Sequence, residues 1–142
     1  MAAVAGPAGV LAQEDGVMGD WIEPTGSVLH IGPCGEEICL WIVSVSPRAP
    51  SSKDIYNPDP SLRERALCGL KVGSGFQWRD ANHAANGTLY DAKAGKTYHG
   101  MLTARGAMLT VRGYLGTPLF GRSETWTRPA SAVRACTPDL GK

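Results

Sequence analysis

The chain consists of short apolar runs, several of them rich in β-branched and aromatic residues, separated by turns that contain Gly and Pro. Runs of this length and composition predict β-strands rather than helices. Ile38–Val45 is a continuous apolar run and predicts a well-buried strand. Turn residues at Pro24–Gly26, Gly73–Gly75, Ala92–Gly95 and Arg105-Gly106 separate such runs. The predicted strands lie near Trp21–Glu23, Ser27–Ile31, Ile38–Val45, Leu67–Val72, Gly75–Trp78, Gly87–Asp91, Tyr98–Ala104, Met108–Tyr114 and Phe120–Arg128.

About eight or nine strands joined mostly by short turns predict an all-β fold, a small antiparallel up-and-down β-barrel with room for one ligand. The orientation of the last strand stays open. Period-two alternation puts Phe120, Arg122, Glu124, Trp126 and Arg128 on one face, and Gly, Ser and Thr on the other. If the Trp face points inward, two charged side chains enter the barrel and need partners. The alternatives are a hydroxyl-lined interior or a β-bulge that switches the faces partway.

The segment Ser46–Ser61 contains four prolines and predicts no regular element. A connection of this length in a small domain is typical of a functional loop or a lid. Asp54, Asn57 and Asp59 offer oxygen atoms here, and Arg63 with the nearby Arg65 offers planar donors for carboxylate or phosphate. The structural alternative is that the Asx side chains cap turns and an Asp–Arg pair fastens the loop to the barrel.

With 142 residues, 43% of them hydrophobic and 19% charged, the chain has the composition of a single globular domain. No apolar run is long enough to span a membrane. Residues 1–15 are small and apolar up to Ala12 and then polar, which predicts a signal-peptide remnant or a disordered tail. We expect residues 16–142 to form the β-barrel domain.

All basic residues lie from Arg48 onward, but they are placed singly along predicted strands and turns rather than clustered on one element, and this argues against a nucleic-acid partner. Cys34, Cys39, Cys68 and Cys136 have no zinc-ligand spacing, and the three His residues lie far apart, so we expect no metal and no cofactor. An even number of cysteines favours disulfides, with Cys34–Cys39 and Cys68–Cys136 as the expected pairs of three alternatives. Disulfides in turn favour a periplasmic or secreted protein.

Several motifs, taken together, resemble one bacterial family. They are Asn57-Pro58-Asp59-Pro60, Leu62-Arg63, Cys68-Gly69, Leu89-Tyr90-Asp91, Gly95-Lys96-Thr97-Tyr98, Val111-Arg112-Gly113-Tyr114 and Trp126-Thr127-Arg128. The chain resembles, from about Gly19 to Arg128, the domain-of-unknown-function family 2147, whose members are small exported proteins. The resemblance implies a lipocalin-type β-barrel, in which a late Arg packs across a Trp of the first strand. Trp21 and Arg128 are the candidates for this pair.

The expected function is to bind or shuttle a small apolar or amphipathic ligand in the cell envelope. The candidate ligand-binding residues are Asp54, Asn57, Asp59, Arg63, Trp78, Tyr90, Tyr98, Arg122 and Trp126. The alternative is an envelope interaction or structural module that uses residues 54–65 as its working surface. We expect no enzyme, since no nucleophile motif is present; an assembled site such as Asp59 with His99 is the third hypothesis. The sequence names neither the ligand nor the oligomeric state.

Overall fold

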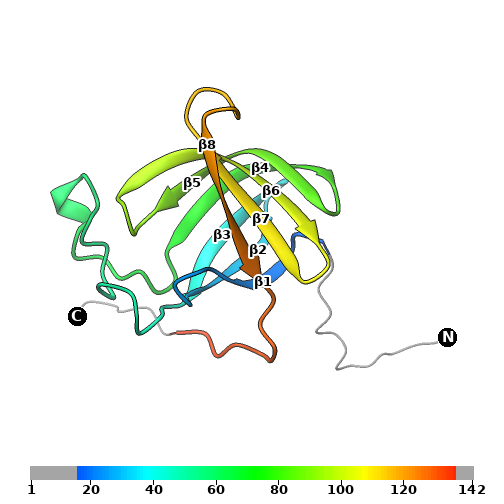
Figure 1. The fold of residues 1–142 in the computed structure, drawn as a ribbon. Helices are drawn as coiled ribbons and strands as arrows, with labels where there is room; N and C mark the ends of the chain where they lie inside the picture. The colour runs from blue at the N-terminus through cyan, green and yellow to red at the C-terminus, as the bar shows by residue number, and fades with distance from the viewer. Residues whose placement is uncertain (1–15, 137–142) are drawn as a thin grey trace.

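The computed structural model describes residues 16–136, and within them eight antiparallel strands close into one barrel in the order in which they occur along the chain (Figure 1). The strands are β1 (Gly19–Ile22), β2 (Val28–Cys34), β3 (Glu37–Ser44), β4 (Lys71–Asp80), β5 (His83–Asp91), β6 (Lys96–Arg105), β7 (Met108–Tyr114) and β8 (Gly121–Thr127). One short 3-10 helix, η2 (Pro60–Leu62), lies in the long connection between β3 and β4. The predicted all-β, up-and-down barrel is confirmed. The predicted leader or tail, residues 1–15, lies outside the described residues.

One part of the strand prediction was wrong. Leu67–Val72 and Gly75–Trp78 were expected to be separate strands joined by a Gly-rich turn, but Lys71–Asp80 is one continuous strand. Gly75 has a φ of 75° inside β4, and the register between β3 and β4 shifts there. Glycine adopts this backbone conformation at little cost, so it makes a bulge within the strand rather than a turn between strands.

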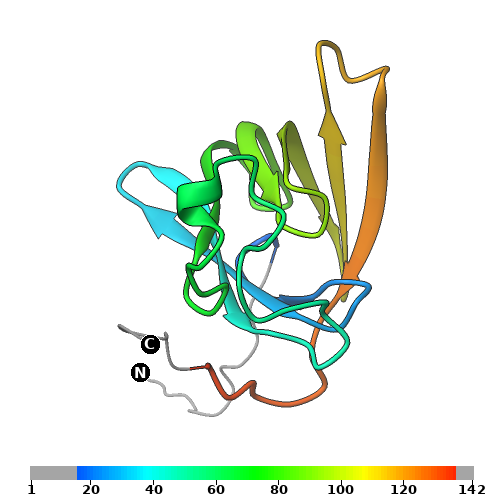
Figure 2. The same cartoon turned by 90° about the vertical axis from the view of Figure 1, so that its left-hand side faces the viewer.

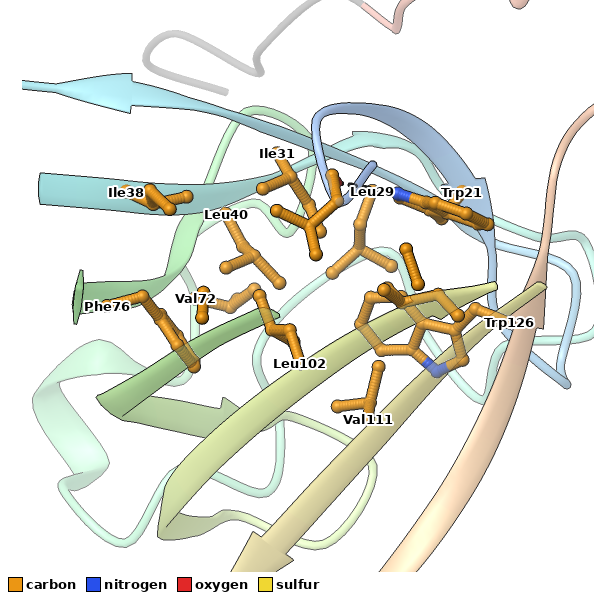
Figure 3. Close-up of a cluster of buried hydrophobic side chains, with 14 of the residues drawn as sticks. Trp21, Leu29, Ile31, Ile38, Leu40, Val72, Phe76, Leu102, Val111 and Trp126 are labelled. Atoms are coloured by element: carbon orange, nitrogen blue, oxygen red, sulfur yellow. Dashed lines mark hydrogen bonds between the residues drawn. The ribbon is translucent and has the colours of Figure 1, made fainter. Parts of the chain in front are cut away.

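One end of the barrel is filled by side chains. Alternate residues of the strands point inward and bury a cluster that includes Trp21, Ile31, Ile38, Leu40, Phe76 and Leu102, drawn in Figure 3. Phe76 fits because β5 and β6 carry glycines beside it. A Cβ atom added at Gly87 or Gly100 would collide with the Phe76 ring. This end is therefore packed as a core and leaves the free volume to the opposite end.

The barrel closes through a narrow contact between its first and last strands. β1 and β8 share a single residue pair, Ile22 with Thr127. Next to this pair, the Arg128 guanidinium carbon lies 3.7 Å from the centre of the Trp21 ring. Arg128 also donates hydrogen bonds to the backbone oxygens of Asp20 (3.1 Å) and Gly16 (3.0 Å). A cation–π contact with added hydrogen bonds thus fastens β8 to the start of the chain, in the pairing implied by the resemblance.

Two disulfides hold the periphery, in the pairing predicted from the sequence. Cys34–Cys39 joins β2 to β3 across their hairpin. Cys68–Cys136 spans 68 residues and ties the irregular C-terminal segment to the connection just before β4. The backbone N–H of Cys136 also donates to the Val43 carbonyl at 2.7 Å. The first disulfide therefore braces a hairpin of the barrel, and the second holds the C-terminal segment, which belongs to no strand.

Candidate functional site

The unfilled end of the barrel contains a pocket of about 730 Å³. Its apolar floor comes from six strands and the segment before β4: Leu29, Ile42, Leu67, Val72, Leu89, Val111 and Trp126. The loop between β3 and β4 forms one side, with Pro50, Lys53, Ile55 and Tyr56 lining the pocket. The volume lies in the range of about 300–1,000 Å³ that is typical of small-molecule sites.

The orientation of β8 decides which charged groups reach this pocket. Trp126 is buried and its ring packs in the barrel interior, near Val111 and Leu102 in Figure 3. Because alternate residues of a strand share a face, Glu124 and Arg122 point to the same side, and both line the pocket. Of the alternatives left open by the sequence, the structure has the Trp face inward, with its two charged residues toward the open end.

Three charged side chains from separate elements meet at the pocket. Lys93, in the turn between β5 and β6, lies with its Nζ 2.9 Å from Oε1 of Glu23, just after β1. The same Nζ lies 3.8 Å from Oε2 of Glu124 on β8. Oε1 of Glu124 accepts a hydrogen bond from the Trp126 indole N–H at 2.9 Å. This network provides the partner that an inward Glu124 requires, and it joins β1, β8 and the β5–β6 turn.

The pKa values reflect this network. Burial alone raises the pKa of Glu23, but hydrogen bonds from the Thr25 backbone, Lys93 and the Ser27 backbone outweigh it and hold that pKa below its usual value. Burial likewise lowers the pKa of Lys93, but its hydrogen bond to Glu23 and the negative charges of Glu23 and Glu124 raise that pKa overall. Both groups therefore stay charged across the neutral pH range.

A second network anchors the loop that forms the side of the pocket. Asp54 is 1% exposed, and its Oδ2 accepts hydrogen bonds from Asn57 (2.8 Å) and from Nε of Arg65 (2.9 Å). Its Oδ1 accepts from the Tyr90 hydroxyl at 2.6 Å. Burial, together with the hydrogen bond to the Asp54 carboxylate, raises the pKa of Tyr90 to about 12. The buried carboxylate thus fastens the loop to β5. This agrees with the alternative given in the sequence analysis, in which an Asp–Arg pair holds the loop on the barrel.

The structure divides the sequence-predicted ligand residues into two groups. Tyr90, Tyr98, Arg122 and Trp126 line the pocket. The others do not line it, and they are Asp54, Asn57, Asp59, Arg63 and Trp78.

The loop members of the second group bond to their own chain. Asp59 caps η2 by accepting hydrogen bonds from the N–H and the hydroxyl of Ser61, and Arg63 donates to the Asn57 carbonyl at 2.7 Å. Trp78 is 44% exposed on β4. A role for these residues in ligand binding stays a prediction.

Sequence reasoning missed the Glu23–Lys93–Glu124 network, because its members are far apart in the chain and belong to no motif. The two side chains of the enzyme hypothesis each have another contact. The centre of the His99 ring lies 5.6 Å from that of the Tyr114 ring, and Asp59 caps η2. Among residues 16–136, no group of three His, Cys, Asp or Glu side chains is placed to hold a metal ion. Nor does the described part of the chain contain a helix that is both long and apolar enough to cross a membrane.

The closed eight-stranded barrel with one filled end and one open pocket defines the protein as a lipocalin-like barrel. In fold it is similar to the protein HP1028 from Helicobacter pylori, which is described as belonging to the lipocalin family. The two share 20% sequence identity with a TM-score of 0.72, over 80% of this chain and 83% of that chain. Residues 19–128 match the family described as "Uncharacterized protein conserved in bacteria (DUF2147)", and the chain belongs to this family. No curated protein matches the chain significantly.

Proposed function

We propose that the protein binds a small, partly apolar ligand in the open pocket of the barrel and does so in the cell envelope. The observation that carries the proposal is the pocket of about 730 Å³ with an apolar floor and charged groups toward its open side. Burying the apolar part of a ligand against Leu29, Val72 and Val111 is favourable because it removes apolar surface from water. Arg122 and the Lys93 network lie where the polar part of such a ligand would stay hydrated.

The charges lining the pocket favour an amphipathic ligand over a purely apolar one. Lys93 is paired with two carboxylates, and Lys53 is paired with Glu64 at 2.9 Å. Within the described residues, the Arg122 side chain has neither a hydrogen bond nor an ion pair. Its planar donors suit a carboxylate or phosphate group at the end of an apolar ligand.

The two disulfides support a place in the cell envelope. Both pairs are formed, and all four cysteines are used. Disulfides persist in oxidising compartments such as the periplasm and are reduced in the cytosol. This argument concerns the compartment and is independent of the ligand.

The first test is native mass spectrometry of the protein purified gently from its own source, before and after solvent extraction. We expect a discrete added mass that extraction removes, and its fragmentation would identify the class of the ligand. The extracted protein is then titrated with the amphipathic fluorescent probe 8-anilinonaphthalene-1-sulfonate, which brightens in apolar sites.

A matched pair of substitutions locates the probe. Ala92 lies in the β5–β6 turn and lines the pocket, whereas Ala107 is exposed in the β6–β7 turn and does not. We expect Ala92→Trp to fill part of the pocket and weaken probe binding about tenfold or more, which corresponds to about 1.4 kcal/mol. Ala107→Trp should bind as the natural protein does. Equal probe binding by two folded variants, together with a bare protein mass, would refute the proposal.

A bare protein mass together with equal probe binding would favour the alternative, an interaction module built on residues 54–65. One observation supports it: Ile55 and Tyr56, which line the pocket from this anchored loop, are still 39% and 48% exposed. Replacing both by Ser would then abolish capture of an envelope partner while the barrel stays folded.

A further inference from the structure

The last strand of the barrel has a free edge along most of its length. β8 pairs with β7 at every position from Gly121 to Thr127. On its other side it pairs with β1 only at Thr127. Figure 2 shows the β7–β8 hairpin extending past the ends of the neighbouring strands. Within residues 16–136, the edge of β8 from Gly121 to Thr125 therefore lacks a neighbouring strand.

The sequence explains why β1 stops short of this edge. Continued antiparallel pairing from Ile22 and Thr127 would set Pro24 opposite Thr125. Proline has no backbone N–H to donate, and Pro24 begins the turn into β2. The Glu23 N–H and the Ser27 carbonyl close this turn with a 2.9 Å hydrogen bond. β1 therefore ends at Ile22, and one edge of β8 is left without a partner strand over Gly121–Thr125.

A free strand edge pairs readily with another strand, and proteins commonly block such edges with charge, proline or short length. Here the edge runs Gly121-Arg122-Ser123-Glu124-Thr125, and all of it beyond Gly121 is exposed. It contains no proline and no lysine, and its two charges are of opposite sign. The charge pattern matters, because it is complementary to itself.

We infer that two copies of the protein join through the free edges of β8, antiparallel and about a two-fold axis at Ser123. In this register Arg122 of each copy lies opposite Glu124 of the other, and Gly121 lies opposite Thr125. Directly opposed residues of an antiparallel pair point to the same face, so the two ion pairs form together. A second copy is thus the partner that the charges of the edge select.

The same register pairs groups that lack full partners in one copy. Arg122 lies on the pocket side of β8, and its side chain has no hydrogen bond or ion pair within the described residues. Glu124 is held by Trp126 on one oxygen and lies 3.8 Å from Lys93 on the other, so its carboxylate has capacity for further donors. The dimer adds the Arg122 of the second copy to this carboxylate, and the five N–H donors of a guanidinium leave some of them for the acidic group of a ligand.

Apolar residues beside the edge add to the contact. Leu119 and Phe120, at the tip of the β7–β8 hairpin, are 84% and 76% exposed. Phe120 shares the face of Arg122, and in the inferred register it lies opposite Trp126 of the second copy, near the opening of that copy's pocket. The contact is short, so we expect a monomer–dimer equilibrium that depends on concentration rather than an obligate dimer.

Cysteine crosslinking tests the register. Ser123→Cys places two thiols at the axis, where opposed Cα atoms lie about 4.5–5.5 Å apart, within the span of a disulfide. In the control Thr125→Cys, the two thiols lie four residues apart along the ladder, roughly 13 Å. Mild oxidation of the full chain should give a covalent dimer with Ser123→Cys and little with Thr125→Cys. Crosslinking of Ser123→Cys that is no stronger than that of the control would overturn the inference.

A charge swap gives an independent readout by sedimentation velocity over a range of concentrations. Arg122→Glu and Glu124→Arg, each alone, set like charges opposite one another and should reduce the dimer fraction several-fold. The double variant Arg122→Glu with Glu124→Arg restores opposite charges and should recover the dimer. A natural protein that stays monomeric at every concentration, or a double variant no better than either single one, would refute the inference. Should a cysteine variant fail to fold, this series decides alone.

Discussion

Replacing the buried carboxylate of Asp54 should destabilise both the fold and the pocket. Asp54 is 1% exposed and accepts hydrogen bonds from Asn57, Arg65 and Tyr90. In Asp54→Ala these three donors lose an acceptor that is itself fully buried, although the Arg65 side chain is partly exposed. Removing one partner of a buried charged network costs about 3–5 kcal/mol, since the groups left behind lose a charged acceptor in a largely desolvated site. This is a large share of the stability of a domain of this size.

Two milder variants divide that cost. In Asp54→Asn, the amide oxygen still accepts from Asn57 and Arg65, and the amide N–H donates to the Tyr90 hydroxyl, which turns to accept. Every group keeps a partner, so we expect a loss of only about 1–2 kcal/mol, from weaker neutral hydrogen bonds. Tyr90→Phe removes one donor, with its 2.6 Å hydrogen bond, and should cost about 1.5–3 kcal/mol.

The assay is urea unfolding followed by circular dichroism, with the disulfides intact. For a slope of about 2 kcal/mol per molar urea, a loss of 4 kcal/mol moves the midpoint by about 2 M. The slope itself should not change. Probe binding to folded Asp54→Ala should also weaken, because the anchored loop supplies Lys53, Ile55 and Tyr56 to the pocket.

Titration of the tyrosines gives a second check. The pKa of Tyr90 is raised to about 12 by burial and by the Asp54 carboxylate, so in Asp54→Asn it should fall toward 10 without reaching it. The tyrosinate absorbance is followed as the pH rises, and subtracting the curve of the Tyr90→Phe variant leaves the ionisation of Tyr90 alone. An Asp54→Ala variant within 0.5 kcal/mol of the natural protein, roughly the effect of an ordinary surface change, would show that the network does not anchor the loop.

Three further predictions concern the closure of the barrel and its periphery. Arg128→Ala should lower the free energy of unfolding in urea by about 2–4 kcal/mol, because it removes the contact with Trp21 and two hydrogen bonds to backbone oxygens. Arg128→Lys should recover only part of that loss. Equal stability of both variants and the natural protein would contradict this. Lys93→Met should cost about 1 kcal/mol at pH 7. That difference should shrink as the pH falls through the lowered pKa of Glu23 and as it rises through the raised pKa of Lys93, and a difference independent of pH would exclude the ion pair as its source. Replacing Cys68 and Cys136 by Ser should lower the free energy of unfolding by about 4 kcal/mol, and replacing Cys34 and Cys39 by Ser should lower it by about 2 kcal/mol. The reason is that the first disulfide closes a loop of 68 residues and the second a loop of only 5. The reverse order of stability in thermal melts would refute the loop-closure argument.

Local patterns were enough to predict the architecture. Strands and their hairpin turns follow from short-range chemistry, as at Gly95 and Gly106, where positive φ angles of 66° and 60° close the predicted turns. The one error in strand count came from a glycine signal with two meanings. Gly75 makes a bulge inside β4, and only pairing with β3 distinguishes that bulge from a turn.

The predicted ligand residues that line the pocket all belong to strands: Tyr90, Tyr98, Arg122 and Trp126. For the two on β8, the sequence had left the inward face open. The loop residues Asp54 and Asn57 stood out equally in the sequence, but they bond to their own chain. Polar residue type shows that a group needs partners, and it does not show whether a ligand or the protein provides them.

By itself, the sequence determined the β-barrel class, the order of strands and the disulfide pairing, because each depends on local periodicity or on few combinations. The Trp21–Arg128 contact was expected from the resemblance to a family, and no local pattern implied it. The tertiary structure alone decided which face of β8 is inward, which end of the barrel is filled, and where Glu23, Lys93 and Glu124 meet. Those features depend on register around a closed barrel. Each strand sets the position of the next, so the outcome is a property of all eight strands together.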